Sequence, residues 1–211
     1  MNFITLRSIN SIMFPSVLLL VVLLIFSIQP SDDIEFQTMK FNEDSLPKQC
    51  RFEGELLGGT KWRDANGENF LIISQNFKTG VDAGIQEIFG YNYVIKDSNY
   101  HLLWKWYDES ENSCEIGEGL IGQIQIEDVD GDGIGESAFI YNIEGVCDLS
   151  PRLFTLVFHS DTTSLTIHGT NRIQIDDTTT RGGEIQTDST FGAAPIEFGD
   201  FCTSLWQRTF E

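Results

Sequence analysis

The sequence predicts a mainly β domain: an antiparallel sheet built from successive hairpins, with a C-terminal helix packed on it, which is a β-rich α+β fold. Two observations predict the sheet, because apolar residues alternate with period two in several short runs and turn residues separate these runs. A third observation is the change to helical spacing in the last segment. The 211 residues are enough for one domain with a substantial core.

The first hairpin is predicted between the apolar runs Phe52–Trp62 and Phe70–Ser74. Between them lies Asp64-Ala65-Asn66-Gly67, and its Asn-Gly pair supplies the positive φ angles that a tight hairpin needs. A second hairpin is predicted from Ile88–Ile95 and His101–Tyr107, which flank Asp97-Ser98-Asn99. In this hairpin the alternation places Phe89, Tyr91, Tyr93 and Ile95 on one face of the first strand, and Leu102, Trp104 and Trp106 on one face of the second.

The rest of the chain continues in the same way and then changes period. Further strands are expected at Leu120–Ile126, Ser137–Tyr141, Leu153–His159 and Ser164–His168. The Thr-, Asp- and Gly-rich segment Asp176–Thr190 predicts a mobile loop. Phe198, Phe201, Cys202 and Leu205 recur at helical spacing after Pro195, so Ala194–Thr209 predicts a helix that closes over the sheet.

The N-terminal segment, residues 1–30, predicts export. It holds one base, Arg7, no acid, and an almost unbroken apolar run from Ile12 to Ile28. A basic start followed by such a run is typical of a secretory signal. The run is also close to the length that spans a bilayer, so a cleaved signal peptide and an uncleaved N-terminal signal anchor both stay open. We expect an exported protein (periplasmic, cell-surface or secreted) with a linker over 31–48 and a single β-rich domain over 49–211. Membrane contact is expected only through the uncleaved segment.

The net charge of −19 limits the partners. A field of this sign repels nucleic acid and anionic lipid head groups, and it attracts divalent cations. The charge therefore excludes a nucleic-acid partner.

Four cysteines, Cys50, Cys114, Cys147 and Cys202, follow the export segment. An even number in an exported chain predicts two disulfides, and four cysteines allow three pairings. We favour Cys114–Cys147, which would clip the segment that carries the acidic loop, and Cys50–Cys202, which would tie the C-terminal helix to the first strand.

The sharpest chemical signal is the acidic loop, residues 128–136. Asp128, Asp130 and Asp132 occupy alternate positions and would offer side-chain oxygens to a hard cation, while Ile134 would offer its backbone carbonyl. Glu136 would complete the shell directly or through water, and Gly133 would permit the sharp turn. Residue 12 of the loop is Phe139, so the loop is not a complete EF-hand. It resembles the D-x-D-x-D-G-x-x-[DE] calcium turns between strands of FG-GAP repeats. We expect structural Ca²⁺ here; an Asp/Gly-rich turn without an ion is the alternative.

The order of motifs from Lys61 to Trp206 resembles an uncharacterised family of exported bacterial proteins, of Bacteroidetes type, labelled surface polysaccharide biosynthesis protein. The matching pieces are Trp62-Arg63-Asp64, Gly67-Glu68-Asn69, Leu71-Ile72-Ile73, Tyr91-Asn92-Tyr93-Val94, Leu103-Trp104-Lys105, Tyr107-Asp108, Asp128–Glu136, Phe139-Ile140-Tyr141, Cys147-Asp148-Leu149-Ser150-Pro151, Ala194-Pro195 and Leu205-Trp206. The resemblance implies a role at the cell surface and assigns no catalytic residue.

Other residues allow rival hypotheses. Tyr91, Tyr93, Trp104 and Trp106 could form a stacking platform for sugar rings, although aromatic alternation on adjacent strands is more often sheet core. Two acids among Glu115, Glu118 and Glu127 could serve glycoside hydrolysis. His101, His159 and His168 lie on predicted strands, and neither a G-x-S-x-G nor an H-E-x-x-H motif occurs.

Two functions therefore remain. The first is an exported or cell-surface non-enzymatic module, stabilised by Ca²⁺ and disulfides, that takes part in surface polysaccharide or envelope organisation. Its partner would be surface polysaccharide or another envelope component. The alternative is a carbohydrate-active enzyme that uses an unidentified carboxylate pair.

Overall fold

The computed structural model describes residues 39–40, 45–79, 83–112, 115–161 and 163–210. The export segment over 1–30 and most of the linker over 31–48 therefore lie outside the described residues. Within the described residues, no helix has the length and apolar character needed to cross a membrane.

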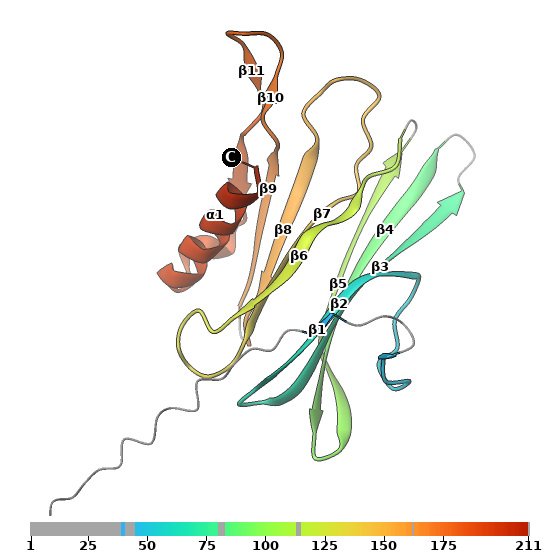
Figure 1. The fold of residues 1–211 in the computed structure, drawn as a ribbon, viewed down its shortest axis with the longest axis vertical. Coiled ribbons are helices and arrows are strands. Elements are labelled where there is room, and N and C mark those ends of the chain that lie inside the picture. The colour runs from blue at the N-terminus through green and yellow to red at the C-terminus, as the bar shows by residue number, and fades with distance from the viewer. Residues whose placement is uncertain (1–38, 41–44, 80–82, 113–114, 162, 211) are drawn as a thin grey trace, which may run out of the picture. The chain divides into compact units, whose positions relative to one another are not determined.

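The described chain forms two five-stranded antiparallel sheets (Figure 1), which confirms a mainly β fold built from successive hairpins. Sheet A consists of β1 (Met39–Lys40), β2 (Glu55–Asp64), β3 (Gly67–Thr79), β4 (Gly84–Lys96) and β5 (Asn99–Asn112), in that order. Sheet B has the order β12-β9-β8-β7-β6, with β6 at Gly119–Glu127, β7 at Glu136–Asn142, β8 at Leu153–His159, β9 at Ser164–Thr170 and β12 at Ile185–Thr187. A separate small hairpin pairs β10 (Ile173–Gln174) with β11 (Thr180–Arg181).

The two hairpin turns of sheet A differ in their chemistry. Between β2 and β3, Asp64 pairs with Gly67, so Ala65 and Asn66 form the turn. Gly67 has a φ of +136°, whereas Asn66 is not among the residues with positive φ. The positive φ predicted for this Asn-Gly pair is therefore confirmed for Gly67 and wrong for Asn66. Between β4 and β5, Asp97 and Ser98 have φ values of 51° and 63°. Positive φ at both central residues is what a type I′ hairpin turn requires.

Three clusters of buried side chains lie on the faces of the two sheets. The inter-sheet cluster lies between sheets A and B: Trp62, Leu71, Ile73, Ile88, Phe139, Tyr141, Ile143 and Val157, with Trp104 and Trp106 packed against it. The outer cluster lies on the other face of sheet A: Cys50, Phe70, Ile72, Phe89, Tyr91 and Tyr93, with Leu46, Phe52 and Leu56 packed against it. The helix cluster lies on the other face of sheet B and is described next.

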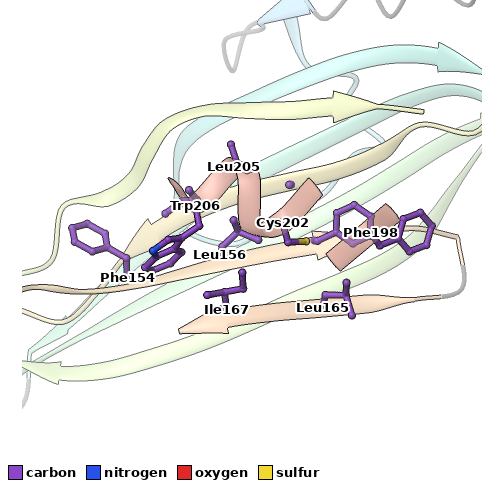
Figure 2. Close-up of a cluster of buried hydrophobic side chains, with 11 residues drawn as sticks. Phe154, Leu156, Leu165, Ile167, Phe198, Cys202, Leu205 and Trp206 are labelled. Atoms are coloured by element: carbon purple, nitrogen blue, oxygen red, sulfur yellow. The ribbon is translucent and has the colours of Figure 1, made fainter. Parts of the chain in front are cut away.

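Helix α1 (Ile196–Phe210) covers the face of sheet B that points away from sheet A, and it contacts β8 and β9 (Figure 1). Its buried residues are Phe198, Cys202, Leu205 and Trp206, which lie on one helical face. Figure 2 shows these side chains directed at Phe154, Leu156, Leu165 and Ile167 of β8 and β9. Glu197 in the first turn and Arg208 in the last turn complement the helix dipole. The predicted C-terminal helix is thus confirmed. The sequence predicts one sheet beneath it, whereas the structure has two large sheets and the helix packs on sheet B.

The segment predicted as a mobile loop, Asp176–Thr190, is more ordered than expected. It contains β11, β12 and part of a 3-10 helix, Ser189–Gly192. The β12 strand pairs with β9, so Ile185, Gln186 and Thr187 add one edge to sheet B. The prediction failed because these strands are only two and three residues long, and their partners, β10 and β9, lie outside the segment.

The long edge strands are β5 in sheet A and β6 in sheet B, and β6 contacts β2 of sheet A. The other two edges, β1 and β12, are short strands. Strand β5 carries the exposed acids Glu109 and Glu111 at alternate positions. In β6 the register shifts between Ile121 and Gln125, where Gly122 has a φ of +67°. Such an irregularity interrupts the row of backbone groups that an edge strand presents.

Candidate metal centre and adjoining cavity

The acidic loop joins β6 to β7 across the paired residues Glu127 and Glu136. Gly131 and Gly133 have φ values of +77° and +85°, a region that glycine adopts without steric penalty. Gly133 is the residue for which the sequence predicted a sharp turn, and its conformation agrees. The loop therefore curls back on itself between two hydrogen-bonded strand ends.

Three of the predicted metal ligands come together in this loop. Oxygen atoms of Asp128, Asp130 and Glu136 all lie within 4.8 Å of one another. Glu136 is only 2% exposed, and the Oδ1 atom of Asp128 is buried without a hydrogen-bond partner. Burial, together with the charges of Asp130, Asp132 and Asp128, raises the pKa of Glu136 to about 7. This is the electrostatic strain expected where carboxylates are crowded without a cation.

The other two predicted ligands are placed differently. Asp132 is not part of the group of three, and its Oδ1 accepts a hydrogen bond from the backbone nitrogen of Ile134 at 2.7 Å. Ile134 lines the cavity described below. Backbone nitrogens also donate to the three grouped carboxylates: Val129 to Glu136 at 2.7 Å, Asp132 to Asp130 at 3.2 Å and Gly133 to Asp128 at 3.0 Å. The loop is thus held in its curled shape by its own backbone.

This donor set fits a hard divalent cation. Every side chain in the group offers oxygen, which Ca²⁺ and Mg²⁺ prefer, and none offers the nitrogen or sulfur that softer metals select. Oδ1 of Asp128 is buried without a hydrogen-bond partner, which costs free energy. A cation bound to this oxygen would remove that cost. Among the described residues, the side chains that can hold the metal ion together are those of Asp128, Asp130 and Glu136.

Asp64 links the acidic loop to sheet A, although the sequence predicts no role for it at the site. Its Oδ2 accepts from the indole nitrogen of Trp62 at 2.9 Å and from the backbone nitrogen of Gly135 at 3.2 Å. Its Oδ1 accepts from the backbone nitrogens of Asn66 and Gly67. The backbone nitrogen of Ala65 also donates to the carbonyl of Gly133 at 2.9 Å. An aspartate before a two-residue turn predicts the local bonds, but no sequence signal predicts the partner in the loop.

A cavity of about 280 Å³, here called the inter-sheet cavity, lies beside this link. Sheet A and sheet B both contribute to its wall. The lining residues are Asp64, Asn66, Asn69, Asn92, Leu103, Trp104, Ile134, Gly135, Ser137, His159, Ser160, Asp161, Thr163 and Ser164.

An aromatic stack forms part of this cavity wall. The rings of Trp104 and His159 lie parallel, with centroids 4.0 Å apart and an interplanar angle of 17°. Burial lowers the pKa of His159 to about 4, so the ring is neutral at physiological pH. Gly90 makes room for this arrangement, because a Cβ there would lie 3.2 Å from both Trp104 and Trp106.

The predicted aromatic platform is wrong, because its four residues lie on two faces of sheet A. Tyr91 and Tyr93 belong to the outer cluster and are 4% and 8% exposed. Trp104 and Trp106 pack against the inter-sheet cluster instead. The cause is the pairing register: Trp104 lies opposite Asn92, and Lys105 lies opposite Tyr91 and places its ammonium group over the Tyr91 ring. No single surface presents the four rings.

The predicted Cys50–Cys202 disulfide is also wrong. Both residues are free and buried, Cys50 in the outer cluster and Cys202 in the helix cluster, and the two sheets lie between these clusters. Burial raises the pKa of Cys50 to about 11 and that of Cys202 to about 12. Cys147 is disulfide-bonded. Its predicted partner, Cys114, lies outside the described residues, so the Cys114–Cys147 pairing stays a prediction.

Two of the three acids considered for glycoside hydrolysis lie together, and a cation lies between them. Glu118 and Glu115 both contact the guanidinium of Arg152, at 2.9 and 3.5 Å. Glu127 ends β6 opposite Glu136, beside the acidic loop. None of the three is among the residues lining the inter-sheet cavity.

Comparison with known proteins finds no relative: no protein-family model, no curated protein and no solved structure matches this chain. The fold and the site alone define the class of the protein, which is a two-sheet antiparallel β domain with an acidic loop at a strand connection and a covering C-terminal helix.

Proposed function

We propose that the chain is an exported, non-enzymatic cell-surface or secreted module, stabilised by Ca²⁺ and disulfide bonding, that takes part in organising surface polysaccharide or another envelope component. One observation carries the calcium part of this proposal. Asp128, Asp130 and Glu136 have oxygens within 4.8 Å of one another, and one buried oxygen of Asp128 has no hydrogen-bond partner.

Simple electrostatics supports a cation at this position. Two carboxylates at such separations repel by roughly 1 kcal/mol even at the dielectric constant of water, and by more where they are buried. A divalent cation replaces this repulsion with attraction. Ca²⁺ is favoured over Mg²⁺ because it accepts irregular oxygen shells, whereas Mg²⁺ demands near-ideal octahedral geometry.

A structural role for the ion follows from where the loop is attached. Gly135 and Gly133 in the loop bond to Asp64 and Ala65 in the β2–β3 turn, so the loop connects sheet B to sheet A. A cation that fixes the loop would therefore also fix the relative position of these two strand connections. The loop carboxylates accept hydrogen bonds from the loop's own backbone, and three of them lie close to one another. An ion bound to them would stabilise the loop.

Export is supported by the N-terminal sequence. Residues 1–30 combine one base with a long apolar run, and Cys147 is disulfide-bonded, as is typical of exported chains. The role in envelope organisation rests on the order of motifs from Lys61 to Trp206. The alternative hypothesis of a carbohydrate-active enzyme gains no support from Glu115 and Glu118, because both are paired with Arg152.

Calcium titration of the protein, purified from an exporting host as that host processes it, tests the proposal. Extracellular sites of this type bind Ca²⁺ at roughly 0.1–1 mM, and at 100 times Kd the gain in unfolding free energy is about 2.7 kcal/mol. Asp130→Asn should lose most of this gain. Asp177→Asn, which removes an exposed acid between β10 and β11, should keep it. No binding heat for the wild-type protein, or an equal calcium response in Asp130→Asn, would contradict the proposal.

A further inference from the structure

The geometry points to the inter-sheet cavity as a binding site for a small, uncharged, hydroxyl-rich ligand, held by Asn92, His159 and Trp104. This site goes beyond the proposed calcium role and does not require the metal. Its walls come from both sheets, so ligand binding would span the interface between them.

The first support is a pair of unpartnered polar atoms in the same cavity wall. Asn92 is 5% exposed, and its Oδ1 is buried without a hydrogen-bond partner. The Nε2 atom of His159 is buried and unpartnered as well. Asn92 comes from β4 of sheet A and His159 from the end of β8 of sheet B. Unmet hydrogen-bonding groups of this kind are rare in folded proteins and need either a ligand or water.

The side chains around these atoms are oriented by the sheets. Asn92 pairs with Leu71 and Trp104, and it therefore faces the inter-sheet layer. His159 pairs with Ser137 and Ser164, which both line the same cavity. The stack of His159 on Trp104 fixes the position of the imidazole ring. Both unpartnered groups are thus held by regular strands, which makes the site pre-organised.

The charges in the wall indicate an uncharged ligand. Neither lysine nor arginine is among the residues that line the cavity, and Asp64 and Asp161 do line it. An anionic ligand would meet only negative charge. A cationic ligand would find the oxygens of Asp64 already engaged by four donors, and Asp161 lies exposed at the wall.

Hydroxyl groups match the remaining chemistry. A hydroxyl donates and accepts at once, so it can donate to Asn92 Oδ1 and serve His159 Nε2 in either tautomer. Ser160, Thr163 and Ser164 add hydroxyls to the wall, and Trp104 adds an aromatic surface. The volume of about 280 Å³ lies at the lower end of ligand pockets. It suits one ring-sized polyol or sugar unit rather than a chain.

Ligand-observed NMR and tryptophan fluorescence test the proposal on the exported protein. The probes are glucose, galactose, mannose, N-acetylglucosamine and myo-inositol, with glucuronate and glucosamine as charged comparators. At least one uncharged probe should show saturation transfer and a fluorescence change. Asn92→Leu and His159→Gln should each weaken its affinity about tenfold, which corresponds to the loss of about one hydrogen bond. Each variant is first checked by thermal unfolding.

The matched control is His168→Gln. His168 lies on neighbouring β9 and bonds to Thr155, away from the cavity lining. Its substitution should leave probe binding unchanged. If Asn92→Leu and His159→Gln fail to fold, Trp104→Phe provides the second test. The tryptophan fluorescence change that a bound probe causes in the wild-type protein should be absent from this variant.

The proposal would be overturned if no uncharged probe binds, which would mean a water-filled cavity, or if only a charged probe binds. It would also be overturned if the Asn92 and His159 variants bind the probe as the wild type does, or if the fluorescence change survives in Trp104→Phe. The same samples are titrated with Ca²⁺. Loss of calcium binding with retained probe binding would reject the metal proposal alone, and the reverse result would reject the cavity proposal alone.

Discussion

Gly135 donates its backbone N–H to Oδ2 of Asp64, 71 residues earlier in the chain, at 3.2 Å. This bond joins the turn of the first hairpin in sheet A to the acidic loop of sheet B. The same Asp64 oxygen receives the indole N–H of Trp62, which is 2% exposed. Four donors thus converge on one carboxylate, and charge-assisted bonds of this kind are stronger than neutral ones.

Asp64→Asn should therefore destabilise the protein. The asparagine amide keeps one acceptor oxygen and loses the other, so some of the four donors lose their partner. We expect a loss of about 1–3 kcal/mol in the free energy of unfolding, measured by urea denaturation. Asp97→Asn, in the other hairpin turn of sheet A, is the matched control and should change stability little. Equal effects of the two substitutions would rule out the proposed link.

Glu136→Gln should stabilise the metal-free protein at alkaline pH. The pKa of Glu136 is raised to about 7, above its ordinary value of 4.5. The folded state therefore keeps this proton longer than the unfolded state, and stability is lost as pH rises from about 4.5 through about 7. Glutamine stays neutral, so near pH 8 in a chelator the variant should unfold with about 3 kcal/mol more free energy than the wild type.

Saturating calcium should reverse that order, because the wild-type carboxylate can bind the ion and the amide binds it more weakly. Chemical denaturation with and without calcium gives both comparisons. A metal-free variant that is less stable than the wild type near pH 8 would show that the Glu136 carboxylate is not under electrostatic strain.

His159 should make the protein sensitive to mild acid. Burial lowers its pKa from 6.5 to about 4, so the unfolded state takes up a proton at a higher pH than the folded state does. The stability contribution is fully present above about pH 6.5 and is lost as pH falls towards about 4. The loss should reach about 3 kcal/mol relative to His159→Gln. The difference between the two denaturation curves removes the shared contribution of the carboxyl groups. Parallel curves over this range would contradict the prediction.

Cys50 and Cys202 should resist thiol reagents until the protein unfolds. Both thiols are buried, and their pKa values are raised to about 11 and about 12, so little reactive thiolate forms near neutral pH. A chromogenic disulfide should titrate no rapidly reacting thiol from these two residues in the native protein. In denaturant it should titrate both. If Cys50 and Cys202 stay unreactive after denaturation without reductant, they are joined to each other or to another thiol.

The sequence predicted the strands well because each hairpin carries its own signal. Alternation in Phe89, Tyr91 and Tyr93 gave the correct face of β4, and the turn at Asp97 and Ser98 gave the correct connection. The division into two sheets was not predictable in the same way. Both sheets consist of hairpins of the same kind. Which hairpins stack is decided by the packing of residues that are far apart in the chain, such as Leu71 and Val157 in the inter-sheet cluster.

The aromatic platform failed for a local reason. The β4–β5 register shifts between Asn92 and Tyr93, so Leu102 lies opposite Tyr93 while Trp104 lies opposite Asn92. One extra residue, Leu103, thereby reverses the phase of the alternation, and period-two counting from Leu102 to Trp104 puts the wrong residues together.

The acidic loop shows the same limit at a site. Spacing alone gathered Asp128, Asp130 and Glu136, because alternate residues in a curled loop point inward. Spacing also included Asp132, which instead accepts the N–H of Ile134. The role of Asp64 depends on chain segments that meet only after folding, and so do the two unpartnered atoms in the inter-sheet cavity, Asn92 Oδ1 and His159 Nε2. No local sequence pattern therefore predicts them.

The acids on the edge strand β5 bear on how neighbouring copies behave when crowded. Two molecules pairing through this edge would bring Glu109 and Glu111 of one chain against the same residues of the other, and like charges placed opposite destabilise strand pairing. The irregular β6 offers no continuous template at the edge of sheet B. Both long edge strands therefore disfavour edge-to-edge pairing between copies of this domain.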